Sequence, residues 1–344
     1  MELVSEPRRR RVRYSGTHPR RYEEKYKELA ADADPEFLAK VRARGMTPAG
    51  THVPILLDEL LSILSLRPGM RGVDATLGWG GHAEHVLAAI APGGELLGLD
   101  VDPLELPRTL ARLAARGHVE PALHARRTNY AALSSVLHEL GWGDGIDFLY
   151  ADLGLSSMQI DTPARGFSYK VDAPLDMRMN PARGRSAADY LATADPMDLA
   201  RVLEENADEP RARTLAPLLA RRRFATTHEL ARVIREALPE RSADEDRTAT
   251  IRRVFQAIRI EVNDEFAVLE RLLQQLPAAL RSGGRVAILS FHSGEDRRVK
   301  KALAAGARGG IYAEVGDEVI RPSGRERHAN PRAAAAKLRW AARA

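Results

Sequence analysis

The sequence predicts an α/β fold built on a mostly parallel, Rossmann-like sheet. From residue 52 onward, short apolar segments alternate with amphipathic ones, and strands that alternate with helices form parallel sheets covered on both faces. A glycine-rich turn follows the first apolar segment, and Asp100 closes the second. A glycine-rich turn with an acid one strand-helix-strand unit downstream is typical of a nucleotide-cofactor site.

The expected elements follow one another in the order that this fold requires. The first half alternates regularly, with helices over 55–64, 82–90, 106–116 and 130–140 and strands over 72–76, 95–100, 122–125 and 146–152. The alternation resumes later with a helix over 263–280, a turn at 282–284 and a strand over 285–291. Residues 333–340 fit a last edge strand, although their alanines suit a helix equally well.

Three regions divide the chain. Residues 1–50 lack sustained periodicity, and we expect a basic, flexible extension with one helix near Tyr22 to Val41. Residues 51–164 and 260–344 carry the α/β pattern. Residues 165–259 show helix starts at Ser186 and at Thr226, with Glu229 three residues after Thr226, but no convincing strand, which predicts a helical insertion.

Composition narrows the class of protein. The 344 residues include no Cys, and the N-terminus has no apolar stretch of signal-peptide kind, so we expect a cytoplasmic protein without disulfides or a membrane span. The net charge is +5, and the ends are the basic part: residues 1–50 hold 12 Lys and Arg against 8 acids, and residues 320–344 hold 7 against 1. Such ends suit a polyanionic partner, or they are solvated tails.

The glycine turn can hold a cofactor but does not name it. Gly78, Gly80 and Gly81 allow close approach of the backbone, and the helix that follows offers free N–H groups and a positive dipole end. Asp100 is placed to accept hydrogen bonds from two ribose hydroxyls. Because Gly78-x-Gly80-x-x-Ala83 also fits the dinucleotide fingerprint, the spacing leaves S-adenosylmethionine and NAD open.

Two further segments follow strands, where ligands of open α/β sheets bind. Asp152 begins the run DLGLSSMQ and is either a ligand contact or the N-cap of the next helix. His292 lies in SFHSGED and either orients the substrate or satisfies the backbone. Near the insertion boundary, Phe167 and Tyr169 either stack on an extruded base or simply pack.

These residues together resemble the ribosomal RNA small-subunit methyltransferase H family, also called MraW. The resemblance rests on DATLGWGGHAEHVL, LGLDVDP, DLGLSSMQID, RGFSY, PLDMRMNP, RVFQAIRIEVNDE and SFHSGEDRR, which occur in order from His52 to the C-terminus. It implies a class I S-adenosylmethionine-dependent methyltransferase fold whose helical insertion, residues 165–259, recognises the substrate. It also implies N4-methylation of a cytidine in the decoding region of 16S rRNA.

The resemblance carries site residues with it. It implies that S-adenosyl-L-methionine is bound by Gly80, Gly81, His82, Asp100, Tyr130, Asp152 and Gln159. Asp152 is also our candidate catalytic residue, because an acceptor beside the cytosine amine would localise its lone pair. Trp79, Val101 and Gly294 depart from the family pattern, and no metal cluster is evident.

The partner implied is the 16S rRNA or the small ribosomal subunit, and the oligomeric state stays open, a homodimer being one option. A non-catalytic RNA-binding assembly factor and an NAD-dependent dehydrogenase remain the alternatives. For phosphate contacts we expect basic side chains of the insertion and of the segment after the fifth predicted strand: Arg221, Arg222, Arg223, Arg252, Arg253, Arg297, Arg298, Lys300 and Lys301.

Overall fold

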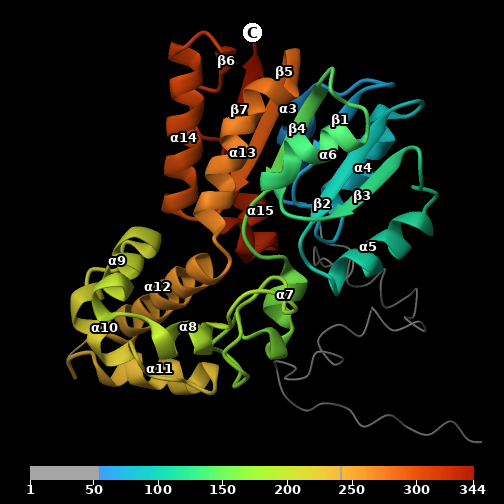
Figure 1. Cartoon of the computed structure of the whole chain (residues 1–344). Coiled ribbons are helices and arrows are strands. Elements are labelled where there is room, and N and C mark those ends of the chain that lie inside the picture. The colour runs from blue at the N-terminus through green and yellow to red at the C-terminus, as the bar shows by residue number, and fades with distance from the viewer. Residues whose placement is uncertain (1–53, 241) are drawn as a thin grey trace, which may run out of the picture. The chain divides into compact units, whose positions relative to one another are not determined.

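The computed structural model describes residues 54–240 and 242–344. The expected N-terminal extension and its helix near Tyr22 to Val41 lie outside these residues. A seven-stranded sheet with the order β3-β2-β1-β4-β5-β7-β6 organises the described chain (Figure 1). Its strands are β1 (Arg71–Asp74), β2 (Glu95–Asp100), β3 (Leu123–Arg127), β4 (Ile146–Asp152), β5 (Leu280–Ser290), β6 (Tyr312–Val315) and β7 (Lys337–Arg343).

The sheet is mostly parallel, as predicted. The first five strands pair in parallel, with Val73 opposite both Leu97 and Leu149, whereas β7 runs antiparallel to β5 and to β6. The chain moves outward from β1 to β3 and then returns to place β4 on the other side of β1. In open α/β sheets, ligands bind outside the carboxyl ends of the strands at such a switch point.

Helices cover both faces because successive strand residues point to opposite sides. Val73, Leu97 and Leu149 face a core shared with α6 (Leu133–Glu139), α13 (Glu265–Ala279) and α14 (Ser293–Arg308). Leu96 and Phe148 face the other core, which holds α3 (Leu57–Leu64), α4 (Gly81–Ile90) and α5 (Glu105–Ala114). Both faces of the strands are therefore buried, which explains their continuous apolar runs.

The helical segment has a core of its own. Its helices are α8 (Ala187–Thr193), α9 (Pro196–Ala207), α10 (Ala212–Leu219), α11 (Thr227–Glu236) and α12 (Asp244–Val262), and they lie together in Figure 1. Leu191, Leu203, Phe224 and Ile258 are among its fully buried side chains. Ser186 and Thr226 cap α8 and α11 as the sequence predicts, each accepting a hydrogen bond from the backbone three residues later.

The C-terminal strands differ from the prediction. The region expected as a last edge strand begins in the short helix η4 (Pro331–Ala335) and continues as the strand β7, which lies inside the sheet, so the strand is present but its edge position was wrong. The edge is β6, a four-residue strand that is too short to show a period of two. Residues 282–284, expected as a turn, belong to an irregularity within β5 opposite β4, because an extra stretch of chain can bulge out of a ladder.

Short helices complete the described chain: η2 (Tyr130–Ala132), α7 (Ser157–Asp161), η3 (Pro163–Arg165) and α15 (Gly324–Ala329). Within residues 54–240 and 242–344, no helix is long and apolar enough to cross a membrane. In the same residues, no group of three or more His, Cys, Asp or Glu side chains is arranged to hold a metal ion.

Candidate functional site

The carboxyl ends of three adjacent strands present acids at one edge of the sheet. Asp74 ends β1, Asp100 ends β2 and Asp152 ends β4, and β1 pairs in parallel with both neighbours. Parallel strands place their carboxyl ends at the same edge, so the topology brings the three acids together. Sequence analysis identified Asp100 and Asp152 but not Asp74.

The glycine turn between β1 and α4 adopts a conformation that favours glycine. Gly78 and Gly80 have φ values of 48° and 75°, a region that side chains disfavour. A Cβ on Gly80 would also lie 3.0–3.1 Å from Arg112, Leu113 and Thr109. Gly80 is the N-cap of α4 and supplies no side-chain cap, so the first turn of the helix keeps donors for a ligand.

Asp100 is held in place by backbone donors on both sides. Its Oδ2 accepts from Gly78 N at 2.7 Å and its Oδ1 accepts from Asp102 N at 2.8 Å. Burial raises the pKa of the Asp100 carboxyl, and these hydrogen bonds oppose that rise. Each carboxylate oxygen has a further lone pair for a hydroxyl donor, so the geometry suits a ribose.

Asp74 is the acid that the sequence analysis missed. Its side chain accepts from Tyr150 Oη at 2.8 Å and from Thr76 N at 3.0 Å, and the residue is 2% exposed. Burial is the main cause that raises its pKa to about 7, with a contribution from the charge of Asp100. An acid directly before a glycine turn was the available signal.

Asp152 has an incomplete set of partners. Its Oδ1 is buried without a hydrogen-bond partner among the described residues, and its Oδ2 lies 3.8 Å from His82 Nδ1. Burial chiefly, then the charges of Asp74 and Glu295, raise the Asp152 pKa to about 7. Ser156 is the N-cap of α7, so the N-cap alternative for Asp152 was wrong.

His82 presents a lone pair toward Asp152. Its Nε2 lies 3.0 Å from the carbonyl oxygen of Ile55, which can only accept, so we assign the proton to Nε2 and leave Nδ1 as an acceptor. Burial lowers the His82 pKa to about 4. The imidazole is therefore neutral near pH 7, and a protonated Asp152 would be the matching donor.

Tyr130 and Gln159 follow the carboxyl ends of β3 and β4, two strands that are separated in the sheet by β2 and β1. Tyr130 begins η2 after β3 and packs against the core below α13; burial raises its phenol pKa, so the ring stays neutral. The Gln159 amide is already bonded at both ends, accepting from Ser156 N at 3.0 Å and donating to Asp102 Oδ2 at 2.9 Å.

Three residues with open alternatives are satisfied within the fold. His292 is the N-cap of α14 and accepts from Glu295 N at 3.4 Å, which is the backbone-satisfying alternative. Phe167 and Tyr169 pack against the helical core, and the Tyr169 ring meets Phe255 edge-on at 5.5 Å. Both aromatic rings therefore pack against the helical core in this structure.

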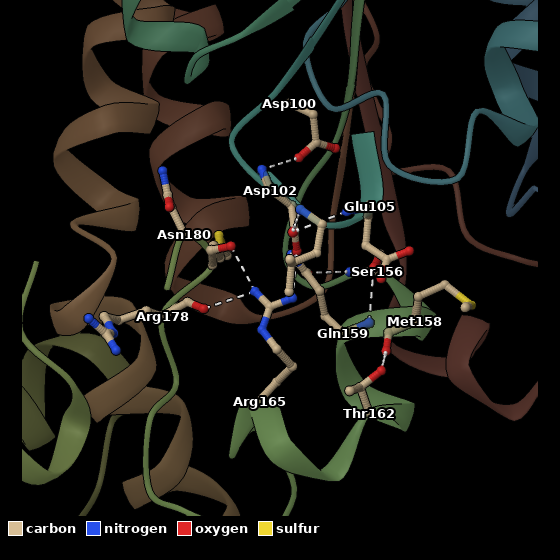
Figure 2. Close-up of polar contacts among 12 residues, drawn as sticks. Asp100, Asp102, Glu105, Ser156, Met158, Gln159, Thr162, Arg165, Arg178 and Asn180 are labelled. Atoms are coloured by element: carbon tan, nitrogen blue, oxygen red, sulfur yellow. Dashed lines mark hydrogen bonds and ion pairs between the residues drawn. The ribbon is translucent and has the colours of Figure 1, made fainter. Parts of the chain in front are cut away.

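A buried polar cluster beside Asp100 was also missed (Figure 2). Asp102 is 1% exposed and accepts from Gln159 and, at 2.7 Å, from Arg165 Nη1. Asp102 and Arg165 are 63 residues apart in the chain, so no local pattern predicts their contact. The only signal in the sequence was that Asp102 is an acid two positions after the end of β2.

The fold and the site define a class of protein. A mostly parallel sheet with an antiparallel β7, an uncapped helix after a glycine turn and a fixed acid after β2 form the α/β fold of class I S-adenosylmethionine-dependent methyltransferases. The family model described as the MraW methylase family matches residues 49–344. The chain belongs to this family, and it is a methyltransferase rather than a nicotinamide-dependent enzyme.

Individual relatives are similar over almost their whole length. The chain is 46% identical to "Ribosomal RNA small subunit methyltransferase H 2" of Alkaliphilus metalliredigens, covering 100% of both chains. It is 45% identical to "Ribosomal RNA small subunit methyltransferase H 1" of Agathobacter rectalis, covering 98% of each. An rRNA methylase structure from Streptococcus thermophilus aligns with a TM-score of 0.40 at 11% identity, over 83% of this chain and 93% of that one.

Proposed function

We propose that this methyltransferase transfers a methyl group from S-adenosyl-L-methionine to N4 of a cytidine in the decoding region of 16S rRNA. The names of the full-length relatives support small-subunit ribosomal RNA as the substrate, and the N4 position of a cytidine in the decoding region comes from the family resemblance of the sequence. The observation that carries the chemistry is Asp152, a carboxyl at the switch point whose buried Oδ1 has no hydrogen-bond partner among the described residues. The small ribosomal subunit is the proposed partner, and the cytoplasm is the proposed place of action.

The residues present fit the cofactor. We assign the methionine part to Gly80, Gly81 and His82, where the uncapped start of α4 suits a carboxylate. Asp100, held by two backbone donors, is the proposed ribose acid. The remaining proposed contacts are the ring of Tyr130 against the adenine, and Asp152 and Gln159.

The bound cofactor supplies an electrophilic methyl group on a sulfonium, and Asp152 acts on the nucleophile. The lone pair of a cytosine amine is delocalised into the ring. In our mechanism Asp152 accepts a hydrogen bond from this amine and localises the pair. Asp152 would take the proton that the amine loses on methylation, and its pKa of about 7 suits a base at neutral pH.

Two features support Asp152 after it has taken the proton. His82 Nδ1, 3.8 Å from Asp152 Oδ2, is an acceptor for the new carboxyl proton. We also propose that backbone carbonyls of the loop from Leu153 to Ser156 help to hold the amine. Holding the amine beside the methyl donor would supply several kcal/mol of the barrier reduction, and the cytosine would be unstacked to reach the site.

We propose that residues 165–259 recognise the RNA. Several of the expected phosphate contacts are already paired: Arg253 with Glu209 at 2.6 Å, Arg297 with Asp208 at 3.0 Å, and Arg221, Arg223 and Arg298 with acids at 2.6–3.0 Å. Others have no carboxylate partner among the described residues. These free cations, the stronger candidates, are Arg222, Arg252, Lys300 and Lys301.

The test is mass spectrometry of nucleosides from small-subunit rRNA of a strain that lacks the gene. We expect an N4-methylated cytidine at one site to disappear and to return with the wild-type gene. A Gly80→Ala, Asp100→Asn double variant should not restore it. An unchanged profile after deletion would reject this substrate, and full restoration by the double variant would favour a non-catalytic assembly factor.

A further inference from the structure

Arg165 joins two parts of the molecule through one buried guanidinium. The residue ends η3 and is 6% exposed. Its Nη1 donates to Asp102 Oδ2 at 2.7 Å, while its Nη2 donates to the carbonyl oxygens of Met179 at 2.7 Å and Arg178 at 3.0 Å (Figure 2). The planar fork of an arginine can make all these contacts at once, and a lysine cannot.

The Asp102 side of this contact leads directly to the ribose acid. Asp102 N donates to Asp100 Oδ1 at 2.8 Å. The Asp102 carboxylate also accepts from Leu104 N at 2.9 Å and from Gln159 Nε2 at 2.9 Å. The loop between β2 and α5 is therefore fixed by Asp102, and a change in Asp102 would move the backbone donor that orients Asp100.

The other side leads to a strained segment at the start of the insertion. Met177 has a φ of 61°, which is costly for a residue with a side chain and persists only where neighbours enforce it. Two neighbours do so here. Met177 N donates to Arg165 O at 3.0 Å, and Asn263 Nδ2 donates to Met177 O at 2.7 Å.

Residues 177–179 are held by hydrogen bonds from two sides. Asn263 Oδ1 also accepts from Met179 N at 2.7 Å, so residues 177–179 lie between Asn263 and Arg165. Gly166 has a φ of 70°, and a Cβ there would overlap the carbonyl oxygen of Pro174 and lie 2.7 Å from Asp176 N. The backbone next to Arg165 is thus packed directly against the segment that Arg165 holds.

We propose that Arg165 is a positioning residue that holds the cofactor-ribose acid and the start of the insertion in one fixed arrangement. Through Asp102 it orients Asp100, and through the carbonyls of Arg178 and Met179 it orients the segment that enters the insertion. The inference rests on the proposed function, because it assigns the cofactor to Asp100 and the RNA to the insertion. It makes alignment of cofactor and RNA depend on one side chain.

The test compares Arg165→Lys with a matched variant, Arg211→Lys. Arg211 makes a similar ion pair with Asp246, at 2.7 and 3.2 Å, inside the insertion and away from the cofactor loop. Affinity for S-adenosylhomocysteine is measured by calorimetry without RNA, and kcat and KM are measured with small ribosomal subunits. We expect Arg165→Lys to weaken the affinity about tenfold and to lower kcat by more than tenfold, and Arg211→Lys to change each less than twofold.

A third variant separates the two sides and covers the case in which Arg165→Lys fails to fold. Asn263→Ala releases residues 177–179 without touching Asp102, so we expect kcat to fall while affinity for S-adenosylhomocysteine stays within twofold of wild type. Equal affinities and equal kcat for Arg165→Lys and wild type would overturn the inference, as would unchanged kcat for Asn263→Ala. If wild-type protein binds S-adenosylhomocysteine but does not methylate the subunit, the proposed function fails, and the affinity of Arg165→Lys still decides the role of Arg165 at the cofactor.

Discussion

Three acids that end strands at the carboxyl edge of the sheet differ from a buried acid of the helical insertion in whether an Arg or Lys pairs with them. Asp74, Asp100 and Asp152 lie at one edge, and none of them pairs with a Lys or Arg among the described residues; burial raises the pKa of each. In the insertion, the fully buried Glu209 meets Arg253 at 2.6 Å. Perturbed and unpaired acids favour a site of chemistry, whereas matched pairs favour a structural role, so we expect changes to these acids to affect catalysis and changes to the Glu209 pair to affect stability.

The largest expected effect comes from removing the acid at the switch point. We expect Asp152→Asn to lower kcat by about 100- to 1,000-fold at saturating cofactor, because a positioned base contributes on this scale. Affinity for S-adenosylhomocysteine, measured by calorimetry, should change only a few-fold. A loss of turnover that merely follows weakened cofactor affinity would reduce Asp152 to a binding residue.

In the insertion, we expect the loss of a charged partner to lower the stability of the fold rather than the rate of catalysis. Arg253→Met leaves Glu209 buried without its partner, and breaking such a pair costs about 3–5 kcal/mol. The Arg253 side chain is 29% exposed, so we expect about 2–4 kcal/mol after screening, seen as a lower Tm. Arg232→Ala, which breaks an exposed pair with Glu236, is the control and should lower Tm little. Equal Tm values for the two variants would contradict a structural role for the buried pair of Glu209 and Arg253.

Asp74 tests whether a buried acid at the carboxyl edge lowers the free energy of unfolding at high pH. A folded-state pKa raised to about 7 from 3.8 means that the native state binds the proton more tightly, so this stability is complete below about pH 4 and is lost as the pH rises through 7. In Asp74→Asn, Oδ1 can still accept from Thr76 N while Nδ2 donates to Tyr150 Oη, so that hydrogen bond reverses its direction and the side chain stays neutral. Relative to wild type it should gain on the order of 1–3 kcal/mol at pH 8 and nothing near pH 4, in urea unfolding. An equal difference at both pH values would contradict the assignment.

The smallest effects belong to the free cations. Replacing Lys300 or Arg252 with Ala should weaken RNA binding slightly and reduce the slope of log affinity against log salt by about one for each phosphate that the protein no longer neutralises. Arg297→Ala is the matched control, because Arg297 already pairs with Asp208. Filter binding across a salt series measures both, and equal slopes for all three variants and the wild-type protein would place the RNA elsewhere.

The same contrast explains what the sequence could predict. Gly80 follows a strand and Asp100 and Asp152 end strands within local patterns, so their position at the carboxyl ends of strands follows from periodicity and topology. The Asp102 to Arg165 contact joins residues 63 apart, and the positive φ of Met177 depends on Asn263. Such contacts depend on tertiary packing, and no window of sequence contains them. The strand β6 was missed for a different reason, since its four residues are too few to show a period of two.

The most direct test of the central claim is the single-turnover rate of methylation of small ribosomal subunits as a function of pH. The product is identified by mass spectrometry, and wild type and Asp152→Asn are compared at saturating S-adenosylmethionine. If the Asp152 carboxylate takes the proton, the wild-type rate of N4-methylcytidine formation rises with pH and levels off above about 7, while the variant is slow and independent of pH. A wild-type rate that does not change with pH, or a variant that keeps the wild-type profile, would contradict it.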